Sequence, residues 1–145
     1  MCGFNIAGPK SREMLQRLSN QNLSNNNWPF MHSGQLSIAG VECLALRISF
    51  SGDLGWEIYC DAEYQEIIYK TLIKASIIEN GGPVGSRALM SLRIEKGYGS
   101  WSREYSPEVW PHESGLEKLC KLDKDFLNKT ALVENLKNEP RERLV

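Results

Sequence analysis

Apolar and polar side chains alternate along residues 41–50, near the middle of the chain. The alternate positions carry large apolar side chains, namely Leu44, Leu46, Ile48 and Phe50. This period of two is typical of a half-buried β-strand. A second strand is predicted at residues 55–60, and the loop at 51–54, which contains Gly52, joins the two strands into a hairpin with a wide turn.

Elsewhere the apolar residues recur at steps of three and four, which is typical of helices. The strongest helix spans residues 61–79, with Asp61 expected to cap its start and a glycine- and proline-rich segment at 80–83 to end it. Its apolar stripe consists of Tyr64, Ile67, Ile68, Thr71, Leu72 and Ala75. A further helix is predicted at residues 86–97. Because it is apolar on several sides, we expect it to be buried.

Weaker patterns complete the prediction. Short strands are expected at residues 4–7, 35–38 and 116–120, and shorter helices at 10–18 and 126–136. Strands and helices alternate, with hairpins between strands. The sequence therefore predicts an α/β (α+β) fold, with an antiparallel-rich mixed sheet and packed helices.

Composition removes several classes of function. The chain has 145 residues and a net charge of −1, so nothing attracts it broadly to nucleic acid or to an anionic membrane. No apolar run approaches the roughly 20 residues that span a bilayer. The N-terminus lacks the basic and apolar regions of a secretory signal. We therefore expect no nucleic-acid partner and no membrane partner.

The cysteine spacing excludes a common kind of metal site. Cys2, Cys43, Cys60 and Cys120 form no Cys-x-x-Cys pair and have no histidine at zinc-finger spacing. We expect four reduced thiols in a reducing compartment and no bound metal.

Two charged residues are candidates for chemistry. Glu57 lies on a predicted strand after a glycine-rich turn, and its carboxylate suits paired N–H donors such as an aminopyrimidine edge. The pattern alone leaves a solvent-facing glutamate as the other interpretation. Arg87 lies in the first turn of a helix, where the dipole disfavours a cation. Its partner is either a carboxylate of the protein or an anionic ligand. Aromatic residues such as Trp56 are able to stack on a ligand, although most such residues form core.

Three segments together resemble the glycine cleavage T-protein family. They are residues 6–12 (IAGPKSR), 47–57 (RISFSGDLGWE) and 85–98 (GSRALMSLRIEKGY). Within that family, Trp56 and the segments at 113–116 and 126–129 are most similar to the dimethylglycine and sarcosine dehydrogenase branch. Residues 96–101 (KGYGSW) lack the cysteine of the folate-dependent iron–sulfur assembly branch, which argues against that branch.

The resemblance implies a tetrahydrofolate site. By position, Glu57 matches the glutamate that hydrogen-bonds the pterin, and Arg87 matches an arginine close to the folate. Phe50 stands where the family commonly has a tyrosine, so the hydroxyl is missing. The predicted cofactor-binding residues are Glu57, Arg87, Phe50 and Trp56.

The resemblance also implies what this chain does not carry. The family's catalytic aspartate lies upstream of Met1, so no catalytic residue is assigned here. Residues 1–136 are expected to form the second half of a folate-binding domain, and the charged tail at 137–145 leads toward a C-terminal β-barrel. No flavin chemistry is expected on this chain. It is expected to be a fragment or a truncated product.

The predicted function is the tetrahydrofolate-binding portion of a one-carbon-transferring enzyme, either an aminomethyltransferase or a dimethylglycine/sarcosine dehydrogenase. Whether the chain is itself an enzyme stays open. The expected partners are folate, an amine-derived one-carbon donor, and either a second copy or a chain that supplies the missing half. The alternatives are a non-catalytic folate-binding or assembly module and an inactive remnant. The expected location is cytoplasmic, or the mitochondrial matrix in a eukaryote.

Overall fold

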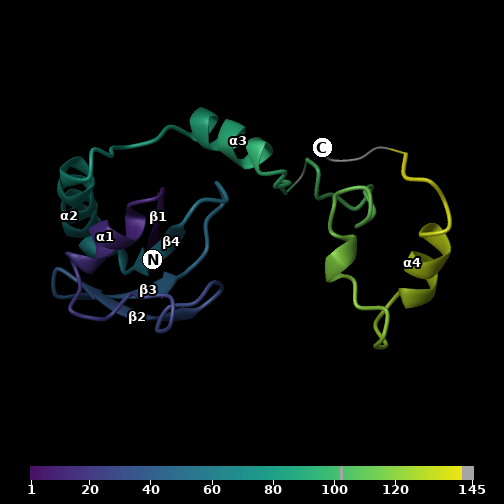
Figure 1. Ribbon diagram of the computed structural model, residues 1–145, viewed down its shortest axis with the longest axis horizontal. Coiled ribbons are helices and arrows are strands. Elements are labelled where there is room, and N and C mark those ends of the chain that lie inside the picture. The colour runs from purple at the N-terminus through teal and green to yellow at the C-terminus, as the bar shows by residue number, and fades with distance from the viewer. Residues whose placement is uncertain (102, 142–145) are drawn as a thin grey trace. The chain divides into compact units, whose positions relative to one another are not determined.

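An antiparallel sheet forms the framework of the N-terminal part of the chain (Figure 1). The computed structural model describes residues 1–101 and 103–141. The strands are β1 (Cys2–Ala7), β2 (Ser33–Ile38), β3 (Val41–Leu46) and β4 (Gly55–Cys60), in the order β1-β4-β3-β2. With the helices, this sheet confirms the predicted fold class.

The strands are joined by the predicted hairpins. Ala39 and Gly40, between β2 and β3, have φ angles of 52° and 80°, the pair of positive values that a type I′ turn requires. β3 and β4 pair with Leu46 opposite Glu57. β3 ends earlier than the predicted residue 50, because the Ile48 N–H donates to the Leu46 carbonyl at 3.0 Å and the chain turns there.

One face of this sheet is covered by α1 (Ser11–Gln16) and α2 (Gln65–Ile78). Apolar residues from both helices and from the strands form the core between them. The sheet's buried members are Leu36, Ile38, Val41, Cys43, Ala45, Trp56, Ile58 and Cys60. The helices contribute Met14, Leu15, Ile68, Leu72 and Ala75. The opposite face, which carries Glu57, lies outside this core.

The two ends of α2 differ from each other. A single 3₁₀ turn, η1 (Ala62–Tyr64), precedes the helix, and the Asp61 side chain makes no capping hydrogen bond, so its predicted capping role was wrong. The cause is that α2 begins one turn later, with Tyr64 at its N-cap. The other end follows the prediction: Asn80 takes a left-handed conformation, and the Gly81 N–H donates to the Ser76 carbonyl at 2.7 Å.

The helix α3 (Ser86–Glu95) lies at the predicted place, but the expectation that it is buried was wrong. Ala88 is exposed and Ile94 is 49% exposed, whereas Arg93 is the buried residue of this helix. Apolar composition shows which side chains gain from burial, but burial also needs a surface to pack against. The core described above does not extend to this helix.

The chain divides into two compact units, residues 1–96 and 97–145. The second unit, as far as it is described, is mostly turns, with η2 (Glu117–Leu119) and α4 (Lys129–Asn135). A strand was predicted at residues 116–120 and is wrong, because local bonds such as Leu119 N–H to the Leu116 carbonyl curl this segment into a 3₁₀ turn. No helix in the described parts of the chain is long and apolar enough to cross a membrane.

Candidate functional site

Glu57 lies on the open face of the sheet, pointing away from the core. In β4 the buried side chains are Trp56, Ile58 and Cys60, whereas Glu57 and Tyr59 alternate with them and are half-buried. The Tyr59 hydroxyl donates a 2.6 Å hydrogen bond to Glu57 Oε2. This bond, with smaller contributions from burial and from the Glu57 charge, raises the pKa of Tyr59. The carboxylate is therefore held in place by a neighbour on its own strand.

The strands on either side of Glu57 contribute one polar and one apolar neighbour on the same face. Asn5 of β1 and Leu46 of β3 lie directly across from Glu57. Gly3 lies across from Tyr59, and a Cβ atom at Gly3 would approach the Tyr59 ring to 2.9 Å. The ring therefore lies close over the bare backbone of β1. These residues share the open face of the sheet, and we define the shelf as Gly3, Asn5, Leu46, Glu57 and Tyr59.

The two glycines before Glu57 are required by the protein's own packing. A Cβ at Gly55 would lie 2.5 Å from the Ile6 carbonyl oxygen and 2.8 Å from Ser49 Cβ. Gly52 has a φ of 76°, and a Cβ there would lie 2.5 Å from Lys96 Cγ. Neighbouring segments of the chain itself therefore approach these two glycines closely.

Lys96 connects two of the segments that resemble the family, residues 47–57 and 85–98. Its ammonium lies 3.7 Å from Asp53 Oδ1, and its stem packs on Gly52, so the residue after α3 contacts the glycine-rich loop. Sequence reasoning missed Lys96, since a lysine near a helix C-terminus is ordinary on dipole grounds. Tyr59 was considered only as an aromatic residue able to stack on a ligand, and its hydrogen bond to Glu57 was not predicted, although a spacing of two on a strand places both on one face.

Trp56 lies on the core face and is fully buried. The guanidinium carbons of Arg12 and Arg47 each lie 5.3 Å from its ring centroid. Burial lowers the pKa of Arg47, and the nearby Arg12 charge adds to that effect. The structure therefore does not bring Trp56 and Glu57 to a common surface, because the protein itself covers the Trp56 ring.

The other two predicted site residues lie in separate places. Arg87 is exposed in the first turn of α3, and no ion pair joins it to a carboxylate among the described residues. Phe50 is half-buried in the loop between β3 and β4. No hydrogen bond or ion pair among the described residues joins the side chain of Arg87 to Glu57. Their roles as folate contacts remain predictions.

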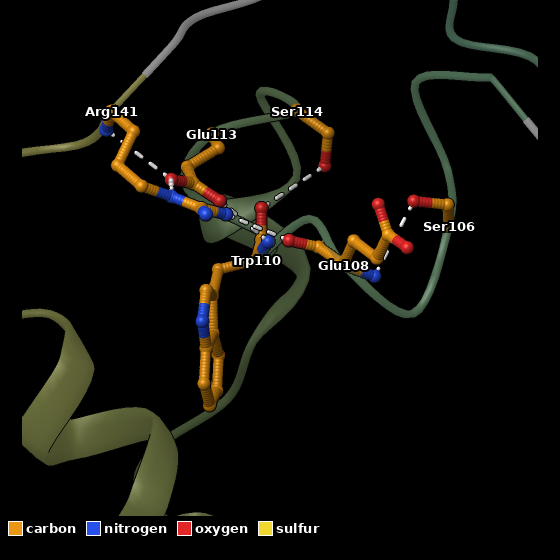
Figure 2. A network of polar contacts seen from close by, with 6 residues as sticks. All are labelled: Ser106, Glu108, Trp110, Glu113, Ser114 and Arg141. Carbon is orange, nitrogen blue, oxygen red and sulfur yellow. Dashed lines mark hydrogen bonds and ion pairs between the residues drawn. The ribbon is translucent and has the colours of Figure 1, made fainter.

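Residues 111–115 form a turn in the second unit, and Glu113 lies in a network of polar contacts there (Figure 2). Glu113 is buried and accepts hydrogen bonds from the Trp110 N–H at 2.9 Å and from the N–H and Nε of Arg141, each at 3.2 Å. The Trp110 bond, followed by the Arg141 side-chain bond, lowers the pKa of Glu113 to about 2. Arg141 also donates to the Glu108 carbonyl at 2.8 Å, so this part of the charged tail is held by specific bonds. The network is structural.

Metal chemistry has no evident place in the part of the chain that is described. No group of three or more His, Cys, Asp or Glu side chains there is arranged to hold a metal ion. The chemistry that the geometry offers is therefore hydrogen bonding by Glu57 on the open face of the sheet, together with the charges at Asp53 and Lys96.

Comparisons with known proteins give a consistent result. The family model of the GCVT N-terminal domain matches residues 1–124. Mitochondrial dimethylglycine dehydrogenase of Mus musculus is 36% identical over 142 residues, which are 97% of this chain and 16% of that protein. Mitochondrial sarcosine dehydrogenase of Homo sapiens is 37% identical over 98% of this chain and 16% of its own length.

An aminomethyltransferase of Caldanaerobacter subterraneus subsp. tengcongensis is 33% identical over 97% of this chain and 37% of that protein. The chain thus spans only a part of each of these relatives. The match of the family model over most of the chain confirms the resemblance drawn from the motifs. This chain belongs to the GCVT N-terminal domain family, together with aminomethyltransferases and dimethylglycine and sarcosine dehydrogenases.

Proposed function

We propose that this chain supplies part of the tetrahydrofolate-binding surface of a one-carbon-transferring enzyme. The family and the names of the relatives, which are an aminomethyltransferase and two amine dehydrogenases, support this class of reaction. The one-carbon donor would be a small amine-derived molecule. The activity of the complete enzyme is part of the proposal, because the chain spans 16% to 37% of these relatives.

The observation that carries the proposal is the unused hydrogen-bonding capacity of the Glu57 carboxylate. Oε2 accepts the Tyr59 hydroxyl, while Oε1 accepts no hydrogen bond from the residues that the structure describes. A carboxylate has about four acceptor sites on its two oxygens, so Glu57 keeps sites for two adjacent N–H donors. An aminopyrimidine edge presents such a pair of donors, and Leu46 and the Tyr59 ring beside Glu57 would offer apolar surface to an aromatic heterocycle.

The roles of the chain's own residues in this proposal are binding and orientation. Glu57 would fix the rotation of the heterocycle in its own plane, and Tyr59 would hold the Glu57 carboxylate in one rotamer. Leu46 would exclude water from one side of the hydrogen bonds. When bound, tetrahydrofolate supplies the nitrogen that accepts the one-carbon unit. Orientation of this kind lowers the barrier by restricting the reactants before the reaction.

Calorimetric titration of the chain with tetrahydrofolate tests the proposal. We expect saturable binding that Glu57→Ala weakens by roughly 1–3 kcal/mol, the scale of hydrogen bonds to a charged group. Glu42→Ala is the matched control, since Glu42 is an exposed glutamate on the same open face, in β3. It should leave the affinity unchanged.

Tyr59→Phe separates contact from positioning. It removes the hydroxyl that orients Glu57 and keeps the ring over Gly3. We expect a smaller loss of affinity than for Glu57→Ala. Saturable binding with equal losses in Glu57→Ala and Glu42→Ala would contradict the proposal. A folded wild-type chain without binding would mean either that another segment of the enzyme builds the pocket or that this chain is a remnant or scaffold.

A further inference from the structure

Two cysteines of neighbouring strands lie directly opposite each other. Cys2 of β1 and Cys60 of β4 are register partners, and their sulfur atoms are 3.3 Å apart. Register partners in antiparallel strands have Cα atoms roughly 4.5–5.5 Å apart. This separation falls within the range that a disulfide bridges without backbone movement. Both residues are free thiols in the structure.

The surroundings of the pair make one thiol accessible and the other sheltered. Cys2 is partly exposed, whereas Cys60 is 4% exposed. Burial, the contact with Cys2 and nearby negative charges raise the pKa of Cys60 to about 12. Cys60 therefore stays protonated, and Cys2 is the thiol that a reagent in solution meets first.

The remaining cysteines are less well placed for this chemistry. Cys43 of β3 is fully buried, and burial raises its pKa. It lies one residue beyond the Leu44–Tyr59 register pair, next to Cys60 on the core face. Cys120 belongs to the second compact unit, where its thiol faces the Leu116 carbonyl. Cys2 thus has one aligned partner.

We propose that Cys2 and Cys60 are a reversible thiol–disulfide site that reacts with low-molecular-weight disulfides such as oxidised glutathione. The Cys2 thiolate attacks one sulfur of the reagent, forming a mixed disulfide and releasing one glutathione thiolate. As the Cys60 thiol attacks the Cys2 sulfur, its proton passes to the glutathione thiolate released in the first step, the Cys2–glutathione bond breaks, and the second glutathione leaves as a thiolate. One disulfide bond is formed on the protein, and the two electrons reduce the reagent to two thiols.

The bond would fix an edge of the sheet. Among the described strands, β1 pairs only with β4, so it is held on one side. Linking Cys2 to Cys60 closes the chain between two residues that are 58 positions apart, which restricts the unfolded state. β4 also carries Glu57 on its other face, but the proposal stands on the cysteine geometry and is independent of folate binding.

The test exposes the folded chain to buffers with increasing ratios of oxidised to reduced glutathione. Free thiols are then blocked by alkylation, and the peptides are identified by mass spectrometry. We expect a peptide that joins Cys2 to Cys60 and lacks the mass of two hydrogen atoms. The oxidised chain should melt a few degrees higher, and a reducing agent should reverse the shift.

Matched variants make the assignment specific. Cys2→Ser should abolish the linked peptide and the melting shift, whereas Cys120→Ser should preserve both. Oxidation of the unfolded chain in denaturant should give mixed pairings, which shows that the fold selects this pair. Four alkylated cysteines in a folded chain at the most oxidising ratio would overturn the proposal. A bond between Cys43 and Cys60 in its place would also overturn it.

Discussion

Different kinds of interaction stabilise the interior of each of the two compact units. Residues 1–96 bury apolar side chains between a sheet and two helices. In the described residues from 97 to 141, Leu132 is the buried hydrophobic side chain, while Glu113 and Ser114 are buried polar ones. Large apolar side chains there remain outside, with Leu127 90% exposed and Trp101 84% exposed.

This contrast indicates where stability is concentrated. Apolar burial contributes in proportion to area and is spread over many contacts. A polar network depends on a few bonds, and its contribution changes with pH when one member is ionised. The first unit should therefore respond most to the loss of core volume, and the second to the charge on Glu113.

The largest effect is expected from Ile58→Ala in the first unit. Ile58 is fully buried, opposite Phe4 of β1 and Ala45 of β3. Truncation leaves a cavity at the centre of the sheet and should lower the free energy of unfolding by about 2–5 kcal/mol. Denaturant titration measures the loss. Hydrogen exchange should locate it in the strands, with little change in the second unit.

Ile78→Ala is the control for this prediction. Ile78 is 64% exposed at the end of α2, so its truncation should change the free energy of unfolding by at most about 0.5 kcal/mol. Equal losses for the two variants would show that the contrast between core and surface in the first unit is wrong.

Sequence reasoning succeeded where the hydrophobic pattern determines the structure. The strand Gly55–Cys60, the hairpin before it and the end of the long helix shortly before Asn80 follow from period, turn residues and capping. It failed for residues 116–120, because apolar residues without a partner strand formed a local 3₁₀ turn. The prediction that α3 is buried was wrong for the same reason, because a hydrophobic pattern does not supply a surface for the helix to pack against.

Only part of the candidate site could be predicted from the sequence by the same reasoning. The period of two places the Glu57 side chain on the other face of its strand from Trp56 and Ile58, and the structure agrees. The Tyr59 hydrogen bond follows from that placement once both residues are known to share a face. The contact between Lys96 and Asp53 joins residues far apart in the chain, and no local pattern predicts it.

The second unit should lose stability in acid, an effect smaller than that of the Ile58 truncation. The pKa of Glu113 is about 2 in the folded chain, below the ordinary value of 4.5. A lowered folded-state pKa means that the stabilisation is complete above about pH 4.5 and is lost as the pH falls toward 2. Amide exchange of residues 97–141 at stepped pH should show protection falling through this window.

Glu113→Gln tests whether Glu113 is the group responsible. The amide keeps the shape but removes the charge that accepts bonds from Arg141, so protection in the second unit should be lower at neutral pH and less dependent on pH. Glu117→Gln, at an exposed position in η2, should keep the wild-type profile. If the pH dependence of amide protection were unchanged in Glu113→Gln, another group would be responsible for the acid sensitivity.

The smallest effect is expected from replacing Asp61, a polar residue of the first unit. Replacing an aspartate that caps a helix usually costs about 1 kcal/mol. Asp61 makes no capping bond, because the 3₁₀ turn separates it from α2. Asp61→Ala should therefore change the free energy of unfolding by less than about 0.5 kcal/mol in denaturant titration. A loss near 1 kcal/mol would mean that Asp61 caps the helix in solution. A local polar bond at the start of α2 would then stabilise the first unit in addition to its apolar core.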